Sequence, residues 1–250
     1  MAHFRHGNNP PIFKPAQSPP SDPAHSAACI FLHGLGDDAA GWATIANQFQ
    51  SANKLPYMQW VFPNAPENQD AMQSAWYTPT RLSPFPSSRP ELDDSEDEEG
   101  MMKSVRYVES LLDDLTSKGV PPNRIVLAGF SQGHAMSLLT GLVSAKYAGK
   151  LAGLVGLSGY LPLAERIQQL RAEAELPAVV GDVPIFLVRG MKDMLVPKRY
   201  FRINREKLQE LGVKDEAVEV HEYEGLAHNT SGEEIRGLCA WLEKVVPPLE

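Results

Sequence analysis

Short apolar runs recur along the chain from residue 27 onwards, and longer amphipathic stretches separate them. The runs are AACIFL (27–32), MQWVF (58–62), RIVLAGF (124–130), LAGLVGL (151–157), VPIFLVR (183–189) and AVEVHEY (217–223). Strands that alternate with helices are typical of parallel sheets, and almost wholly apolar strands are typical of sheets covered on both faces. The sequence therefore predicts an α/β fold with a mostly parallel, doubly wound sheet flanked by helices.

The stretches between the runs have the spacing of amphipathic helices. In residues 101–118 one face carries Met101, Val105, Val108, Leu112 and Leu115. A glycine followed by two prolines ends this stretch, as expected at a helix C-terminus. The stretches 132–145, 198–211 and 232–246 are predicted to be helices as well. Right-handed crossovers would place these helices on both sides of the sheet.

The length of 250 residues fits one α/β domain. Residues 1–25 are polar and hold six prolines in the first 23 positions, so we expect a disordered arm before a single domain at 26–250. The arm lacks the apolar segment of a secretory signal. No apolar run reaches the roughly 18 residues of a membrane-spanning helix. The sequence thus predicts a cytoplasmic protein without an integral membrane segment.

The net charge of −8 is concentrated in residues 91–99 (ELDDSEDEE), which hold seven acids and no base. The rest of the chain is close to neutral and has no stripe of Lys and Arg, which argues against nucleic acid as a partner. Cys29 and Cys239 lie in apolar segments without a neighbouring His or Asp. We expect two buried thiols in a reducing compartment, with no metal site and no cofactor.

Gly129-Phe130-Ser131-Gln132-Gly133 fits the pattern G-x-S-x-G, directly after one apolar run and before a predicted helix. The two glycines leave room for a turn that holds the serine at unfavourable backbone angles. This placement is typical of the nucleophile in α/β-hydrolases. A pattern with three fixed positions recurs by chance, so the assignment depends on finding a base and an acid elsewhere.

A serine hydroxyl needs a base and a group that orients the base, and in α/β-hydrolases these follow in the order Ser, acid, His. Asp193 lies on the loop after VPIFLVR, whereas Asp182 and Asp215 precede strands and belong to the opposite edge of the sheet. His228 lies on the loop after AVEVHEY, just before the last helix. Asp193 and His228 are therefore the predicted partners of Ser131.

Other histidines are poorer candidates for the base. Three lie in the arm, at positions 3, 6 and 25, and His221 lies inside a strand. His134 follows the nucleophile by three residues on the same helix, so its side chain should point away from the serine hydroxyl. We interpret His134 as helix packing or as part of the pocket wall.

A developing oxyanion needs two N–H donors. Gln132, the residue after the nucleophile, provides one at the N-terminus of a helix. The second should come from the loop after an earlier strand, and AACIFL runs directly into His33-Gly34-Leu35-Gly36. An ordinary glycine turn is the alternative, and the presence of the other parts favours an oxyanion turn.

Residues 78–100 interrupt the alternation of strands and helices, with four prolines followed by the acidic run. A loop of this length in a compact domain is usually functional or disordered. One interpretation is helix capping: Asp97, Glu98 and Glu99 precede the 101–118 helix, and Glu99 can pair with Lys103. The other is a lid or rim over the active site that disfavours acidic ligands.

Seven motifs occur in a fixed order: FLHGLGDD (31–38), FPNAP (62–66), Trp76-Tyr77, GFSQGHA (129–135), LSGYLP (157–162), GMKDMLVP (190–197) and YEGLAH (223–228). Together they resemble the phospholipase/carboxylesterase family, which includes acyl-protein thioesterases and small lysophospholipase-like esterases. The resemblance covers about residues 27–247. It implies a triad of Ser131, Asp193 and His228. It further implies oxyanion donors and substrate-binding positions, which are Leu35 and Gln132, and Trp76, Tyr77, His134, Leu161, Leu195 and Val196.

The chain departs from the family pattern at three places. Thr78 stands where an Asp commonly follows the aromatic pair, and His134 replaces a second glycine after GFSQG. Residues 83–93 look like an addition beside the acidic segment of the family. All three lie near where an acyl chain or a leaving group would run.

The sequence therefore predicts a cofactor-independent serine hydrolase that cleaves carboxylic ester or thioester bonds through an acyl-enzyme. An acyl-transferring or product-releasing esterase for a specialised small-molecule metabolite is the alternative among enzymes. A non-catalytic ligand-binding protein on the same fold is a third hypothesis, and the complete triad weighs against it. The expected partners are a small-molecule or acylated-protein ester or thioester and, in a weak homodimer, a second copy of the chain.

Overall fold

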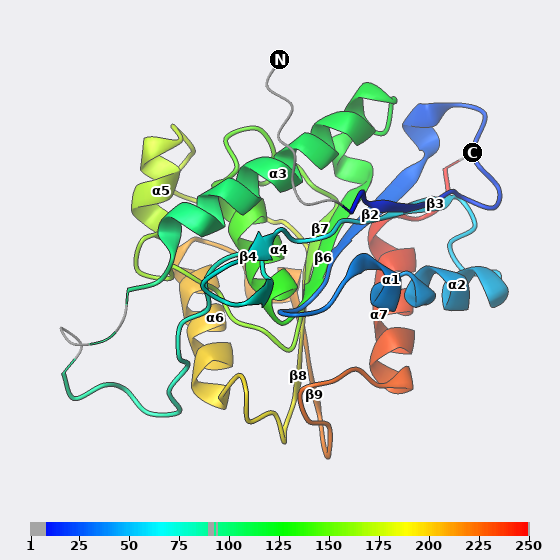
Figure 1. The fold of residues 1–250 in the computed structure, drawn as a ribbon. Helices are drawn as coiled ribbons and strands as arrows, with labels where there is room; N and C mark the ends of the chain where they lie inside the picture. Colours follow the sequence, from blue (N-terminus) through cyan, green and yellow to red (C-terminus); the bar gives the residue numbers. More distant parts are fainter. Residues whose placement is uncertain (1–8, 90–92, 94, 250) are drawn as a thin grey trace.

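A seven-stranded sheet forms the centre of the computed structural model, which describes residues 9–89, 93 and 95–249 (Figure 1). The strands are β1 (Ile12–Lys14), β2 (Ala27–Leu32), β3 (Met58–Phe62), β6 (Ile125–Phe130), β7 (Gly153–Leu157), β8 (Ile185–Gly190) and β9 (Val218–Tyr223). Their order across the sheet is β1-β3-β2-β6-β7-β8-β9. β1 is antiparallel to β3, and the other pairs are parallel. The mostly parallel, doubly wound α/β fold is confirmed.

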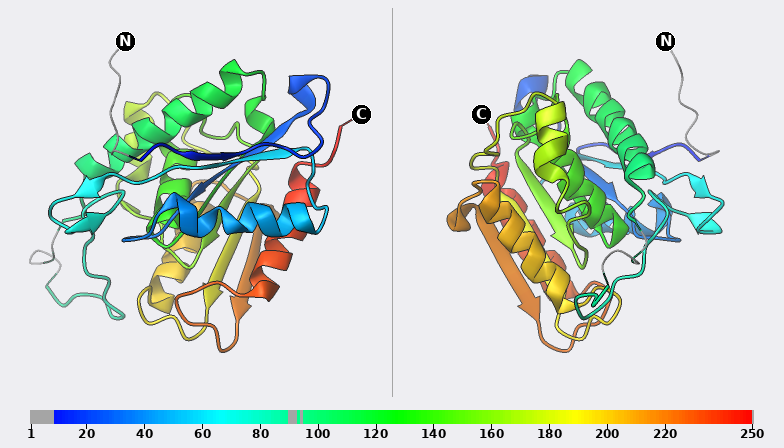
Figure 2. Two further views of the ribbon diagram at one scale, coloured as in Figure 1. Left: turned by 45° about the vertical axis from the view of Figure 1, so that its right-hand side comes forward. Right: turned by 90° about the vertical axis from the view of Figure 1, so that its left-hand side faces the viewer.

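Helices cover both faces of the sheet (Figures 1 and 2). One face packs against α3 (Glu98–Ser117), α4 (Gln132–Val143), α5 (Ile167–Glu173) and α6 (Lys198–Glu210). The other packs against α1 (Ala39–Trp42), α2 (Thr44–Ser51) and α7 (Gly232–Val245). β2 illustrates why both faces must be covered. Its side chains alternate between the two hydrophobic clusters, and every residue of the strand is buried.

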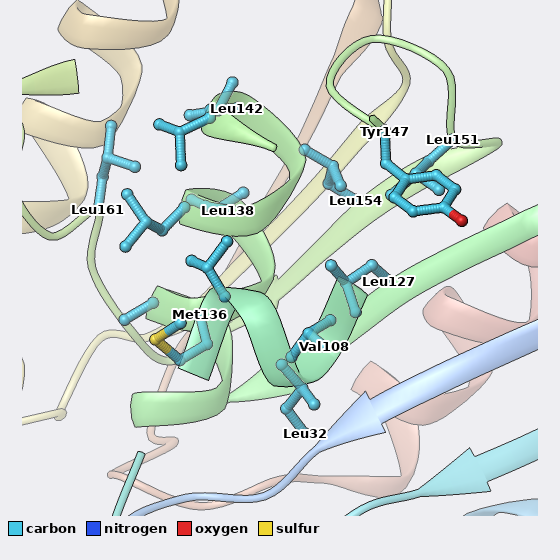
Figure 3. Packing of buried hydrophobic residues seen from close by; sticks show 14 of the residues in the cluster. Leu32, Val108, Leu127, Met136, Leu138, Leu142, Tyr147, Leu151, Leu154 and Leu161 are labelled. Atoms are coloured by element: carbon cyan, nitrogen blue, oxygen red, sulfur yellow. The ribbon is translucent and has the colours of Figure 1, made fainter. Parts of the chain in front are cut away.

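The helix that follows the serine motif is the most deeply buried of the helices. All residues of α4 are buried, because the helix is sandwiched between the sheet and the helices α3 and α5. Figure 3 shows Met136, Leu138 and Leu142 of this helix within one cluster of buried side chains that also includes Leu32, Leu127 and Leu161. Burial of every residue of α4 holds the start of this helix, and with it the serine, in one position.

The predicted strands agree with the structure to within two residues. The helices α3, α4, α6 and α7 were also expected from the sequence, whereas α1, α2, α5 and the small hairpin β4–β5 (Glu67–Asn68 and Gln73–Ser74) were not. The acidic residues before α3 cap it: Asp97 accepts from the N–H of Gly100, and Glu99 pairs with Lys103 at 2.7 Å. The capping interpretation of these acids is confirmed.

The prediction of a disordered arm through residue 25 is wrong for residues 9–25. Residues 12–14 form β1 and pair with residues 60–62 of β3, and Ile12 packs partly buried against the core. A short 3-10 helix, η1 (Pro23–His25), follows with an Asp22 cap. The backbone of β3 provides the hydrogen-bond partners, so a three-residue strand can form between prolines. Residues 1–8 of the predicted arm lie outside the described residues.

Candidate active site

Ser131 occupies a strained turn between β6 and α4. Its backbone angles are φ 54° and ψ −116°, a region that residues with a Cβ rarely adopt. Close packing of the backbone makes the two flanking glycines necessary. A Cβ on Gly133 would lie 2.0 Å from the carbonyl oxygen of Leu32, and a Cβ on Gly129 would lie 2.1 Å from the carbonyl oxygen of Gly133. The packing of Gly133 against the end of β2 and of Gly129 against the first turn of α4 explains the G-x-S-x-G spacing.

The three residues predicted as a triad come together at the carboxyl edge of the sheet. His228 Nε2 lies 2.9 Å from Ser131 Oγ, and His228 Nδ1 lies 2.8 Å from Asp193 Oδ2. The second carboxylate oxygen of Asp193 accepts from the backbone N–H groups of Leu195 and Val196, both at 2.9 Å. Every oxygen of this carboxylate therefore has a donor.

The Asp193 carboxyl remains ionised although it is buried. Burial alone would raise its pKa, but the hydrogen bonds from His228, Val196 and Leu195, together with the charge of the imidazole, lower the pKa below its ordinary value. The charged carboxylate can hold a proton on His228 Nδ1, which leaves Nε2 free to face the hydroxyl of Ser131.

Gly190, the last residue of β8, allows the loops after β8 and β9 to approach each other closely. A Cβ on Gly190 would lie 2.3 Å from the carbonyl oxygen of Leu226 and 2.6 Å from that of Ala227. The N–H of Lys192 also donates to Leu226 at 2.9 Å. Because Gly190 has no side chain, the loop that carries Asp193 and the loop that carries His228 lie against each other. The two side chains are therefore within hydrogen-bond distance.

The turn after β2 lies directly against the nucleophile. A Cβ on Gly34 would be 3.3 Å from the Cβ of Ser131, and Gly36 has φ +72°. Leu35 directly follows Gly34 in this turn, and Gln132 directly follows Ser131 as the first residue of α4, so both residues predicted as oxyanion donors belong to segments that meet at the nucleophile.

Comparison with known proteins agrees with this arrangement. Residues 16–246 match the Phospholipase/Carboxylesterase family. The chain belongs to this family. Acyl-protein thioesterase 1 of Yarrowia lipolytica is 38% identical over 236 residues, covering 92% of this chain and 96% of the relative. Acyl-protein thioesterase 1 of Emericella nidulans is 36% identical over 228 residues, covering 89% and 92%.

A solved structure also has the same architecture. The crystal structure of Zea mays acyl-protein thioesterase 2 has a TM-score of 0.74 and 26% identity, covering 96% of this chain and all of the maize chain. This phospholipase/carboxylesterase family member is therefore a single-domain α/β-hydrolase. It is a serine hydrolase that acts on ester or thioester bonds.

The residues predicted to bind substrate in this family member differ in exposure. Leu195, beside the triad acid, is 67% exposed, whereas Val196 and Leu161 are buried. Trp76 and Tyr77 are also buried, and the Tyr77 hydroxyl donates to that of Tyr160 at 3.0 Å. Only Leu195 among these side chains is open to an incoming acyl chain without a rearrangement.

His134 packs inside the molecule behind the nucleophile. The ring is fully buried, and a Cβ on Gly156 or Gly159 would lie 2.5 Å from it. Its Nε2 lies 3.4 Å from the amide of Asn204, and burial lowers its pKa to about 3. A role as a substrate contact does not agree with this burial. The helix-packing interpretation accounts for the histidine, which fills space left by two glycines.

A cleft whose wall includes no triad residue lies along the segment that follows the β4–β5 hairpin. It has a volume of about 850 Å³ between the β4–β5 hairpin and α3, with Trp76, Tyr77 and Thr78 in its wall. Over the part of the chain that the structure describes, no three His, Cys, Asp or Glu side chains gather in a way that could hold a metal ion. The same residues include no helix of the length and apolarity that crossing a bilayer requires.

Two contacts of the site have no signal in the sequence. The ring of Phe130 lies 5.0 Å, centroid to centroid, from the imidazole of His228, with the two ring planes tilted by 48°. The side-chain amide of Gln132 bonds to the backbone of Trp76 and Tyr77. Sequence reasoning gave Gln132 a role for its N–H alone. Its partners lie more than fifty residues away, beyond the reach of a local pattern.

Proposed function

We propose that this serine hydrolase removes acyl groups from proteins by hydrolysing thioesters, with Ser131 as the nucleophile. The observation that carries the proposal is the hydrogen-bonded series Ser131–His228–Asp193 on a strained turn. Support for acylated proteins as substrates comes from the two fungal relatives, which are acyl-protein thioesterases and match over almost their whole length.

In the proposed acylation step, Ser131 Oγ attacks the thioester carbonyl carbon and passes its proton to His228 Nε2. Only the uncharged imidazole can accept this proton. Asp193 holds the other ring proton at Nδ1 and stabilises the imidazolium that forms. The N–H groups of Leu35 and Gln132 bind the oxyanion of the tetrahedral intermediate. When the intermediate collapses, the C–S bond breaks and His228 returns its proton to the sulfur, so a free thiol leaves.

Deacylation repeats these roles with water as the nucleophile. His228 takes a proton from the water, the hydroxyl adds to the acyl carbon, and the same N–H groups bind the second oxyanion. Collapse then breaks the C–O bond to Ser131 Oγ, which regains its proton from His228. The products are a carboxylic acid and the starting enzyme.

The acyl chain would lie along the apolar side chains beside Asp193. Met191, Met194 and Leu195 are all more than half exposed on this loop. Exposed methionine and leucine side chains adapt readily to a flexible alkyl chain. We therefore propose that the acyl path starts over Leu195.

The test combines an active-site probe with matched substrates. A fluorophosphonate probe should label the wild-type protein and not the Ser131→Ala variant. Equal labelling of both would remove Ser131 as the nucleophile. Oxyesters and thioesters with the same acyl chain, and an S-acylated peptide, then separate the substrate classes. A preference for small oxyesters, with no release of acid from the peptide, would reject the thioesterase proposal and leave a carboxylesterase.

We infer that the protein acts in a reducing, cytoplasmic compartment. Both cysteines are free and buried, and burial raises the pKa of each thiol. Imaging of the tagged full chain together with compartment markers tests this placement. The weak homodimer stays a prediction, which sedimentation velocity over a range of protein concentrations would test.

A further inference from the structure

The side chain of Gln132 ties the start of α4 to the segment after β5. The N–H of Trp76 donates to Gln132 Oε1 at 3.0 Å, and Gln132 Nε2 donates to the carbonyl of Tyr77 at 3.0 Å. The residue is 6% exposed, so water competes little for these bonds. Two bonds to consecutive residues fix the position and the orientation of this segment relative to the nucleophile.

The side chain of Trp76 connects this segment to the turn after β2. Its indole N–H donates to the carbonyl oxygen of His33 at 2.8 Å. The indole ring is buried and packs near two other rings, with its centroid 5.1 Å from that of His33 and 6.3 Å from that of Tyr107. These contacts restrict the orientation of the indole N–H donor.

The His33 ring fixes the next peptide group. The N–H of Ala65 donates to His33 Nε2 at 2.9 Å, so this nitrogen carries no proton and Nδ1 does. Nδ1 then donates to the carbonyl oxygen of Gly34 at 2.7 Å. Burial lowers the pKa of His33, which keeps the ring in this neutral form.

The direction of the Gly34 carbonyl decides where the N–H of Leu35 points. Both belong to one planar trans peptide, in which the C=O and N–H bonds point in opposite directions. Holding the oxygen on the His33 ring therefore aims the N–H the other way. A flipped peptide would present a carbonyl oxygen where the site needs a donor, beside the Ser131 Cβ that Gly34 approaches.

We infer that Trp76 and the side chain of Gln132 are positioning residues of the oxyanion hole. Through His33 they connect the two N–H donors, one on Gln132 and one on Leu35, into a single hydrogen-bonded unit that is assembled before substrate binds. This inference rests on the proposed function, because it assigns a task to residues around the same nucleophile.

Positioned donors act on the charge that develops in the transition state, so their loss lowers kcat more than it changes KM. Complete loss of one oxyanion donor costs on the order of 100- to 1,000-fold in kcat. A donor that remains but is misaligned should cost less. We expect a decrease in kcat of about 10- to 100-fold when a positioning contact is removed.

Two variants test the inference independently. Trp76→Phe keeps an aromatic ring but removes the N–H that reaches His33. Gln132→Met keeps the backbone N–H and the approximate side-chain volume but removes both amide bonds. Trp60→Phe is the matched control, since Trp60 is an equally buried tryptophan that packs between Phe49 and Phe62 on the opposite face of the sheet.

We expect kcat to fall in Trp76→Phe and in Gln132→Met with KM within about threefold, while Trp60→Phe keeps both constants. The double variant should lose little more than the worse single variant, because both changes break one series of contacts. The rate of fluorophosphonate labelling should fall in parallel with kcat. If Trp76→Phe fails to fold, Gln132→Met alone decides the question.

Unchanged kcat in Gln132→Met, or an equal fall of kcat in Trp60→Phe, would overturn the inference. Fully additive losses in the double variant would also count against a connected unit. If labelling does not depend on Ser131, the proposed function fails instead, so the two failures are distinguishable.

Discussion

Asp193 Oδ2 accepts from His228 Nδ1 at 2.8 Å while the carboxylate is almost completely shielded from water. A shielded charge of this kind is tolerated because the other oxygen is bound by two backbone N–H groups. The backbone of the loop after β8 therefore holds the Asp193 side chain in its charged form. The carboxylate in turn fixes the orientation of the His228 imidazole.

Replacing the carboxylate with an amide should disable the base without unfolding the protein. In Asp193→Asn the new NH₂ group can face His228 Nδ1, which favours the tautomer with the proton on Nε2. We expect kcat to fall by roughly 1,000- to 10,000-fold, as measured with a chromogenic ester and checked by circular dichroism. Asp182→Asn is the control, since Asp182 is an exposed surface residue paired with Lys214. A loss smaller than tenfold would contradict the assigned role.

The backbone strain at Ser131 should appear as a difference in the free energy of unfolding between two variants. At φ 54° a residue with a Cβ costs about 1 kcal/mol relative to glycine. Both Ser131→Ala and Ser131→Gly lose the nucleophile, and we expect Ser131→Gly to be more stable than Ser131→Ala by about that amount. Urea unfolding of the two inactive variants makes the comparison. Equal midpoints would mean that the turn relaxes when the hydroxyl is removed.

The buried carboxyl of Glu234 should make stability depend on pH. Burial raises its pKa from 4.5 to about 7, against the opposing effect of the hydrogen bond from the N–H of Ser231. The folded state therefore holds this proton more tightly than the unfolded chain does. The contribution of the Glu234 proton to the free energy of unfolding is fully present below pH 4.5 and is lost as the pH rises through about 7.

Glu234→Gln removes this loss because the amide cannot ionise, and its oxygen can still accept from Ser231. We expect the variant to gain up to about 3 kcal/mol over wild type at pH 8 and little at pH 4.5. Chemical unfolding at both pH values measures the difference. Glu233→Gln, at an exposed neighbouring position, should change neither value. A gain of equal size at both pH values would point to packing rather than to ionisation.

Arg199 attaches the segment after Tyr77 to the start of α6, and Figure 2 shows this segment running past that end of the helix. Its guanidinium donates to the carbonyls of Phe85 at 2.8 Å and Ser83 at 3.2 Å. We expect Arg199→Leu to release the segment, so that trypsin cleaves the bond between the exposed Arg81 and Leu82 at least about tenfold faster.

Arg202→Leu is the control for this prediction, since Arg202 lies on the same helix and pairs only with Glu206 at 3.4 Å among the contacts described. Mass spectrometry of limited digests identifies the cleavage site. Identical cleavage rates in both variants would show that Arg199 does not hold the segment.

The central strands and the triad could be predicted because both depend on local pattern. β2, β6 and β8 are buried on both faces, so their sequences are nearly pure apolar runs. The parallel arrangement then places Ser131, Asp193 and His228 at one edge, whatever the details of the loops between them.

What the sequence did not predict depends on partners that are distant along the chain. β1 is too short to show alternation, and it exists because β3 offers it a backbone edge. The amide of Gln132 looks like any polar side chain at a helix start until Trp76 is placed beside it. His134 allowed two interpretations, and only the glycines on β7 and after it decide between them.

The short strand β1 has a consequence for how the protein behaves in concentrated solution. Without it, β3 would be the outermost strand and would present a row of unpaired N–H and C=O groups beside an apolar surface. Such an open edge is a template for pairing with other chains. Residues 12–14, although remote from the chemistry, cover part of this edge, and we expect truncation before residue 15 to lower the solubility of the protein.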